Sequence, residues 1–238
     1  MIEYLSFNTL TSSVGGNTVT ASERAIFVPS FSIAPTGTFT NTINNNNISV
    51  QSGIAAGTQN GIINETTTGT ATSSLSISNN NFNTFGHTAA VPTGATTFIN
   101  STMAHLSTTI SSNTFTNITL PSTGSVTFLG NPIAVPTSGG TQTINGNSVV
   151  TGFSKTGAGG NITVFTSNAS SVTGSIISMQ NNNFSNITAT GATNFVGINN
   201  TDGGSPTKTI SGNTFNNING GTGTFNPITV ISLVVQAR

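Results

Sequence analysis

Apolar and polar residues recur along this chain in a unit that is clearest at residues 109–118, Thr-Ile-Ser-Ser-Asn-Thr-Phe-Thr-Asn-Ile. An apolar residue stands three positions before its first Asn, and another stands two positions after that Asn. The unit occurs seven times, with this Asn at Asn17, Asn46, Asn80, Asn113, Asn147, Asn182 and Asn213. The spacings of 29, 34, 33, 34, 35 and 31 residues give a period of about 33, which is typical of a repeat architecture.

Each position of the unit keeps its chemical character from one repeat to the next. The residue three positions before the Asn is always apolar: Val14, Ile43, Ile77, Ile110, Ile144, Met179 and Ile210. The residue two positions after it is also apolar: Val19, Ile48, Phe82, Phe115, Val149, Phe184 and Phe215. The residue directly after it is polar: Thr18, Asn47, Asn81, Thr114, Ser148, Asn183 and Thr214. Such columns predict repeats that stack with equivalent residues one above another.

The two apolar columns are five residues apart, and this odd spacing predicts a corner in the backbone. Residues on the same side of one β-strand are separated by even numbers, so a straight strand would leave one column in water. The residue before the Asn is always Gly, Asn or Ser, the types that best tolerate the backbone angles of a corner. We therefore expect Ile110 to end one strand, Ser112-Asn113 to turn the chain, and Phe115 to lie in the next strand.

A third strand is expected farther along each repeat, where β-branched and aromatic residues are bounded by Gly, Pro, Ser and Thr. The candidates are residues 25–28, 61–64, 96–100, 125–129, 161–165, 193–198 and 228–231. Helices are not expected, because Gly, Asn, Thr and Ser are poor helix formers and no apolar pattern of period 3.6 is sustained. The chain is therefore predicted to be all-β, a single β-solenoid over residues 1–238 with about seven coils of about 33 residues and three strands per coil.

Two of the repeats carry a resemblance to a known family: residues 209–215, Thr-Ile-Ser-Gly-Asn-Thr-Phe, and residues 77–82, Ile-Ser-Asn-Asn-Asn-Phe. They resemble the repeats of right-handed parallel β-helix proteins of the pectate-lyase-like superfamily, above all the Asn/Thr/Ser-rich repeats of secreted bacterial surface proteins. The resemblance covers nearly the whole chain and implies that the corner Asn side chains stack from coil to coil as a ladder. It implies little about activity, because this fold serves lyases, hydrolases, phage tailspikes, adhesins and passive stalks.

Composition adds that the chain carries almost no charge. Only 3% of its residues are charged and its net charge is zero, against about 25% charged residues in typical domains. Neither nucleic-acid binding nor membrane insertion is expected, because there is no basic surface and no apolar run of 18 residues. The chain has no Cys, and its residue usage resembles that of exported surface proteins. No signal peptide is visible, so we expect either a segment of a longer extracellular or cell-surface repeat protein or a chain that lacks its export signal.

Acidic residues are too widely scattered to predict a catalytic pair. Glycoside hydrolysis requires two carboxylates about 5–9.5 Å apart. The four acids are separated by 20, 42 and 137 residues: Glu3, Glu23, Glu65 and Asp202. The adjacent Glu23 and Arg24 are expected at a solvated corner, and residues 199–204 at another exposed corner. A single Asp there cannot supply the several carboxylates of a calcium loop.

The two histidines, His87 and His105, have no carboxylate or Cys at ligand spacing and are expected at surfaces or corners rather than on a metal. Lys155 lies on a Gly-rich loop without the Lys-Ser/Thr of a phosphate loop. No catalytic, cofactor-binding or metal-binding residue is therefore predicted, and no cofactor.

One extended feature remains, the polar column after each Asn. It is expected to face outward as a stripe consisting of Thr18, Asn47, Asn81, Thr114, Ser148, Asn183 and Thr214. Three interpretations are open: a solvated strand face, a flat surface for a glycan or protein, or an ice-binding surface. The last is considered because regular Thr arrays hold ordered water. Our hypothesis is a non-catalytic stalk, filament or adhesin whose partners are neighbouring repeats, copies of itself end to end, and surface glycans. The alternatives are a carbohydrate-binding or ice-binding solenoid and, less favoured, a polysaccharide-degrading enzyme.

Overall fold

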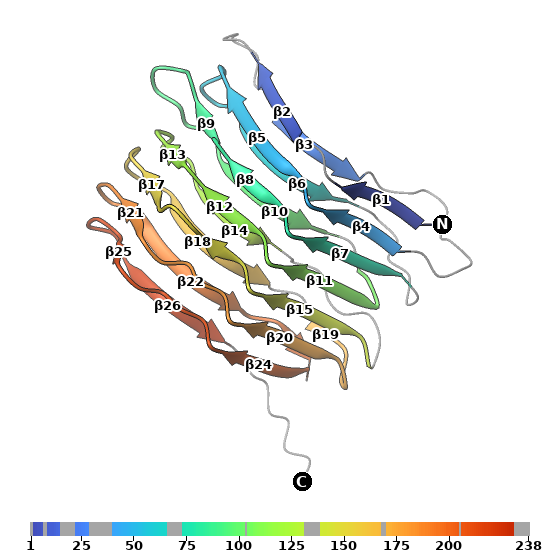
Figure 1. Ribbon diagram of the computed structural model, residues 1–238. Coiled ribbons are helices and arrows are strands. Elements are labelled where there is room, and N and C mark those ends of the chain that lie inside the picture. The colour runs from blue at the N-terminus through green and yellow to red at the C-terminus, as the bar shows by residue number, and fades with distance from the viewer. Residues whose placement is uncertain are drawn as a thin grey trace.

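The chain coils into a parallel β-solenoid, seen in a computed structural model (Figure 1). The structure describes residues 2–6, 9–14, 22–28, 40–65, 73–102, 104–130, 139–167, 170–204 and 206–230. These residues form 26 strands and no helix. Strands that neighbour one another within a sheet are parallel and come from successive coils, so the sheets run along the stack. The predicted all-β solenoid is confirmed.

Two of the sheets contain seven strands each, one strand from every coil. Sheet 1 consists of β1 Ile2–Ser6, β4 Thr40–Asn44, β7 Ser74–Ser78, β11 Ser107–Ser111, β15 Thr141–Asn145, β20 Ile176–Gln180 and β24 Thr207–Ser211. Sheet 4, which corresponds to the predicted third strands, consists of β3 Ser22–Val28, β6 Thr58–Asn64, β10 Thr96–Ser101, β14 Val126–Gly130, β18 Asn161–Ser167, β22 Asn194–Asn200 and β26 Phe225–Val230.

Two shorter sheets lie between these along each coil. Sheet 2 consists of β2 Thr9–Val14, β5 Asn47–Ser52, β8 Asn81–Asn83, β12 Thr114–Thr116 and β16 Ser148–Val149, with β9 Gly86–His87 also paired to β5. Isolated bridges carry it on through Asn183 to Thr214. Sheet 3 consists of β13 Ile118–Leu120, β17 Phe153–Lys155, β21 Ile187–Ala189 and β25 Ile218–Asn219. A two-stranded pair, β19 Ser170–Ser171 and β23 Gly203–Gly204, completes the described strands.

The predicted corner between sheets 1 and 2 is confirmed by backbone angles. The residue before the ladder Asn adopts a positive φ in each described coil from the second onward: Asn45 56°, Asn79 56°, Ser112 55°, Gly146 64°, Asn181 56° and Gly212 65°. The left-handed region is open to Gly and is tolerated by Asn, which explains the residue types of this column.

The expectation of three strands per coil is wrong, because a second left-handed corner creates sheet 3. Positive φ values recur four residues after the ladder Asn, at Thr84 58°, Asn117 52°, Asn186 58° and Asn217 55°; the longer fifth coil uses Gly152, at 93°. The residue after this corner is apolar and turns into the core, as Ile118 and Phe153 do. The sequence signal was Asn-x-Phe-x-Asn-Ile, which occurs in three of the seven units, at residues 113–118, 182–187 and 213–218.

The position predicted for the corner of the first coil is also wrong. Val14, expected just before the corner, lies at the end of β2 and pairs with Ser52. Leu5 pairs with Ile43 and Thr9 pairs with Asn47, so the corner of this coil falls between β1 and β2. Asn17 and Thr18 lie outside the described residues. The longer first repeat misled the alignment, because the sequence offers a second Asn-Thr pair nine residues downstream of Asn8-Thr9.

The core between the sheets is a column of apolar side chains dominated by Phe. Phe82 stacks on Phe115 of the next coil with ring centroids 5.1 Å apart, and Phe98 stacks on Phe128 at 5.0 Å. Phe98 and Phe115 meet edge to face at 5.1 Å, which joins the two columns. Burying each ring contributes on the order of 1.5–3 kcal/mol, and offset and edge-to-face contacts add to that.

Candidate functional site

The ladder at the first corner is made by the side-chain amides from Asn46 to Asn213. In each step the backbone N–H and the Nδ2 of one Asn both donate to the Oδ1 of the Asn in the next coil. For Asn113 and Asn147 these distances are 3.1 and 2.9 Å. The Nδ2 of Asn113 also donates back to the carbonyl of Ile77 at 3.0 Å. The hydrogen bonds from one ladder amide to the next therefore link neighbouring coils, while Asn46 and Asn147 also donate to a carbonyl two residues earlier in their own coil.

These amides satisfy the backbone groups that the corner would leave unpaired. The ladder Asn from the second to the sixth coil are buried: Asn46, Asn80, Asn113, Asn147 and Asn182. An unpaired buried backbone group costs about 1–3 kcal/mol. An Asn is needed because it supplies an acceptor and two donors on a short side chain. The ladder is therefore structural, and no reactive group lies on it.

The predicted outward stripe lies in sheet 2, and much of its hydrogen-bonding capacity is used within the stripe. Asn81 donates to the Oδ1 of Asn47 at 3.0 Å, and Thr114 donates to the Oδ1 of Asn81 at 3.1 Å. Thr116 donates to the same oxygen at 2.9 Å. From Asn47 to Thr114 the stripe is therefore a hydrogen-bonded surface row.

A more regular polar surface is the outer side of sheet 1, which sequence reasoning did not single out. From β4 to β24 its central column is placed by the strand register and contains only Ser and Thr: Thr42, Ser76, Thr109, Thr143, Ser178 and Thr209. A second column, two residues earlier, contains Thr40, Ser74, Ser107, Thr141, Ile176 and Thr207. Parallel strands lie about 4.8 Å apart, and alternate residues about 6.6 Å apart along a strand, so the hydroxyls form a rectangular lattice. The signal in sequence is hydroxyl-x-hydroxyl just before the corner.

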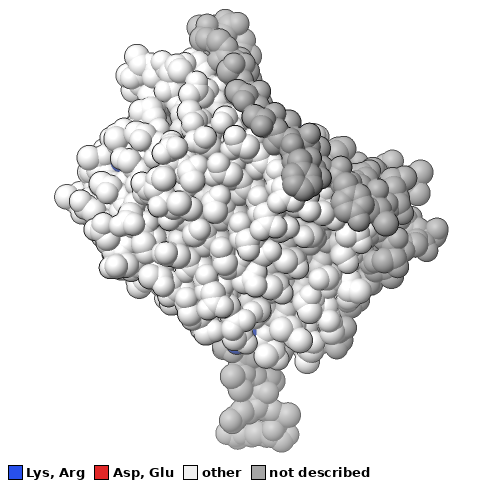
Figure 2. All heavy atoms as spheres, in the orientation of Figure 1, with Lys and Arg blue, Asp and Glu red and all other residues white. Residues whose placement is uncertain are grey.

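The surface around these columns is nearly free of charge. Figure 2 shows one face of the molecule on which Lys and Arg atoms are confined to a few points and no Asp or Glu atom is visible. Ser107 and Thr141 share a hydrogen bond of 3.0 Å across their strands. The face offers a ligand hydroxyls and water rather than ion pairs.

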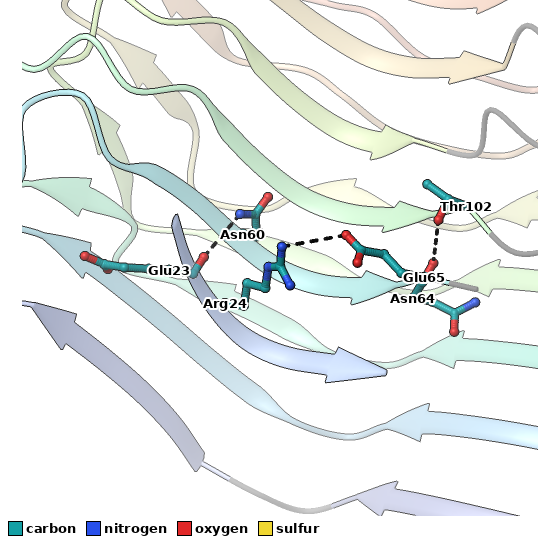
Figure 3. Close-up of polar contacts among 6 residues, drawn as sticks. All are labelled: Glu23, Arg24, Asn60, Asn64, Glu65 and Thr102. Atoms are coloured by element: carbon teal, nitrogen blue, oxygen red, sulfur yellow. Dashed lines mark hydrogen bonds and ion pairs between the residues drawn. The ribbon is translucent and has the colours of Figure 1, made fainter. Parts of the chain in front are cut away.

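The charged residues of the first two coils are arranged differently from the predicted solvated corner. Both Glu23 and Arg24 lie in β3 and point to opposite sides of the sheet (Figure 3). Exposed Arg24 reaches the carboxylate of Glu65 in the next coil at 3.8 Å, and its guanidinium lies 4.4 Å from the ring centre of Phe27. Glu23 is buried instead, so the predicted exposure of this residue is wrong. Alternation along a strand sends neighbours to opposite faces.

Glu23 lies among buried polar residues of the first coils. Neither carboxyl oxygen makes a hydrogen bond of good geometry, and burial raises the pKa of Glu23, while the hydroxyl of nearby Ser52 acts in the opposite direction. Ser52 pairs in register with His87, whose two ring nitrogens also make no hydrogen bond of good geometry. Burial lowers the pKa of His87, while a hydrogen bond with the backbone of Ile54 acts in the opposite direction. Gln59, in register with Glu23, donates to the carbonyl of Gly86.

The second histidine is held in a buried polar cluster at the end of sheet 4. His105 lies 2.9 Å from the hydroxyl of Ser73 through Nδ1, and 3.2 Å from Nδ2 of Asn64 through Nε2. Because an Asn Nδ2 is a donor, Nε2 accepts and Nδ1 carries the proton toward Ser73. Such a tautomer does not withdraw a proton from the serine. Burial lowers the pKa of His105 to about 4. Both histidines were expected at surfaces or corners, and the surface position is wrong because both are buried.

Two further charged groups are buried at corners. Lys155 ends β17, and its ammonium donates to the carbonyls of Gly157 and Gly159 at 2.5 and 2.7 Å; burial lowers its pKa. Asp202, expected at an exposed corner, is buried and accepts from Ser167 at 2.7 Å. Both groups are therefore used to fix turns of this chain.

No set of three or more His, Cys, Asp or Glu residues that could hold a metal ion occurs within the described ranges. The same part of the chain has no helix that is long and apolar enough to cross a membrane. The buried groups Lys155, His105 and Asp202 lie at separate corners, whereas Glu23 and His87 both lie near Ser52. The cavity lined by Leu129, Ile144, Phe184 and neighbouring residues is apolar.

The fold and these surfaces define a class: an almost uncharged parallel β-solenoid repeat protein held by buried Asn ladders. Comparison of the chain with protein-family models, with curated proteins and with solved structures finds no match.

Proposed function

We propose that the chain is a non-catalytic structural or adhesive module of a secreted or cell-surface protein, acting as a stalk, filament or adhesin. The observation that carries this proposal is the unbroken ladder, which joins six successive coils from Asn46 to Asn213. A stack held by the same buried contacts at every step is a stiff rod whose length is set by the number of coils. Its uncharged outer faces suit contact with neutral polymers.

The similarity of the repeats to Asn/Thr/Ser-rich surface-protein repeats of the pectate-lyase-like superfamily supports an extracellular location. The buried titratable groups also support a passive role. The carbonyls of Gly157 and Gly159 hold Lys155, and Ser167 and Asn200 hold Asp202. Each of these groups serves its own corner.

The proposal is tested by exposing the full chain to plant, bacterial and animal polysaccharides and measuring both binding and release of reducing ends. Binding on a glycan array without release supports an adhesin, and neither binding nor release supports a stalk. Release of reducing ends that is lost in Glu23→Gln or Asp202→Asn, but not in Glu65→Gln, would overturn the non-catalytic proposal.

A second candidate function is ice binding, and the hydroxyl lattice of sheet 1 favours it. Thr42, Thr109 and Thr143 present hydroxyls at the regular spacing of a parallel sheet. From β4 to β24 the two columns contain no aromatic ring on which a sugar would stack and no charge; Tyr4 of β1 is in register with Thr42. A rigid lattice of uncharged hydroxyls suits ordered water.

This candidate predicts thermal hysteresis and shaped ice crystals in solutions of the full chain. Thr109→Lys with Thr143→Lys would abolish both effects, because two ammonium groups interrupt the central column. The matched control is Thr97→Lys with Thr127→Lys on the outer side of sheet 4, which adds the same charge elsewhere. Wild-type protein without hysteresis, or equal loss in both variants, would eliminate ice binding by this face.

A further inference from the structure

The last described coil presents to solvent the same side-chain positions that every inner coil buries. Phe225 in β26 is 49% exposed, whereas Phe195, its register partner in β22, is 1% exposed. Ile228 is 50% exposed, whereas its partner Ile198 is 3% exposed. The last coil therefore ends in an apolar surface shaped like an inter-coil contact.

The ladder and two strand edges at this end also stop without a following coil within the described chain. Asn213 is the last ladder member, and no Oδ1 of a following coil faces its backbone N–H within the described chain. Edge strands β24 and β26 each pair on one side only. Unpaired strand edges beside exposed apolar residues are a template for pairing with another chain.

Features that usually protect an edge strand are present but do not block this one. Pro227 lacks an N–H, yet it occupies a position that the strand register skips in each coil, as Gly197 does in β22. It therefore removes no hydrogen bond from the ladder of strands. Lys208 in β24 donates to the carbonyl of Asp202 at 2.8 Å, so its ammonium is fixed at a corner.

We propose that this end docks against the first coil of a second copy of the chain. The first coil contributes β1, β2 and β3, which are the opposite edges of the same sheets, and all strands run parallel. A head-to-tail contact would thus continue the inter-coil interface already repeated along the stack. Two C-terminal ends placed face to face would set the Asn213 N–H donors against each other.

A head-to-tail contact has different surfaces on its two sides and does not close on itself, so the product is an open filament one solenoid wide. This inference deepens the proposed structural role by naming its partner. The two can fail separately, because a chain that never assembles still qualifies as a stalk or adhesin, and an assembling chain could still cleave a polysaccharide.

The test follows the full chain by sedimentation velocity and negative-stain electron microscopy over a hundredfold range of concentration. We expect filaments of constant width whose length increases with concentration. Phe225→Lys with Ile228→Lys should leave the protein monomeric, because the charges would be buried at the contact. The control pair Thr97→Lys and Thr127→Lys adds the same charge to a lateral face and should still assemble.

Mixing provides a second measurement that identifies the polarity. A small fraction of the Phe225/Ile228 variant should shorten wild-type filaments, because its intact first coil still caps a growing end. Circular dichroism verifies that the variant is folded, and the single Ile228→Lys replaces it if it is not. Dimers that never grow would overturn the proposal in favour of a face-to-face contact. Monomers at every concentration would also overturn it, and hydrogen-exchange protection of residues 225–230 in such monomers would identify residues 231–238 as the occupant.

Discussion

Replacing Asn113 by Ala tests the energetic role of the ladder most directly. In the native protein the Asn113 amide accepts from the N–H and Nδ2 of Asn80, at 3.0 Å each, and donates to the carbonyl of Ile77 and to Oδ1 of Asn147. The substitution removes all four bonds at a fully buried site. Two backbone groups, the Asn80 N–H and the Ile77 carbonyl, lose this partner without gaining access to water.

The magnitude follows from those two groups. A buried backbone group without its partner costs about 1–3 kcal/mol, so Asn113→Ala should destabilise the fold by about 2–6 kcal/mol. For a chain of this length a loss of about 4 kcal/mol corresponds to a melting temperature about 8–16 °C lower. The matched control is Asn81→Ala on the outer face, where lost groups can bind water and the cost should stay below about 1.5 kcal/mol.

Thermal and guanidinium unfolding followed by far-ultraviolet circular dichroism would measure both variants, and hydrogen exchange of the Asn80 N–H would report the local effect. A third variant, Asn113→Asp, keeps the acceptor but sets a carboxylate against the oxygens of Ile77 and Asn147. It should be more destabilised at pH 8 than at pH 4, where protonation restores a donor. Equal stabilities for the Asn113 and Asn81 variants, or an Asp variant as stable as wild type at pH 8, would refute the reasoning.

Three other predictions follow from the core, a corner and the buried imidazole. Phe115→Ala should cost about 3–5 kcal/mol because it leaves a cavity in the aromatic column, while Thr114→Ala should cost little; equal thermal shifts would contradict the assigned faces. Asn117 has a positive φ, so Asn117→Val should lower the free energy of unfolding by about 1–2 kcal/mol, whereas Asn117→Gly should leave it unchanged. Unfolding experiments on the two variants measure the difference. Burial lowers the pKa of His105 from 6.5 to about 4, so the unfolded chain binds the proton more readily between these values. Stability should therefore fall by up to about 3 kcal/mol as pH drops from about 6.5 to about 4, and His105→Gln should flatten that dependence.

The repeat made the solenoid predictable because stacking forces equivalent residues into columns. The odd spacing of Ile110 and Phe115 located the first corner, and the positive φ of Ser112 bears this out. The second corner was missed although Asn117 belongs to the same unit. In a polar sequence, an Asn at a corner cannot be told from an Asn on a strand surface. For Asn117 the only distinguishing sign is the apolar Ile118 that follows it.

The burial of charged and titratable residues could not be read from residue type. Glu23, Lys155 and Asp202 are charged types that usually lie at the surface. Each is buried because strand alternation or a corner turns its side chain inward. Which residues turn inward depends on where each strand begins and ends, and a period of about 33 residues does not determine those positions. The hydroxyl lattice of sheet 1 was missed for another reason: Ser and Thr are so frequent that their alternation stands out only after the register aligns the strands.

The ladder has a consequence for how the molecule comes apart. Each inner amide is at once donor and acceptor, so every hydrogen bond in the row polarises its neighbours and the middle of the row is held more firmly than its ends. Opening an inner coil breaks contacts on two sides, whereas opening a terminal coil breaks them on one. Unfolding should therefore begin at the termini and proceed inward coil by coil, with amide protection rising toward the coil of Asn113.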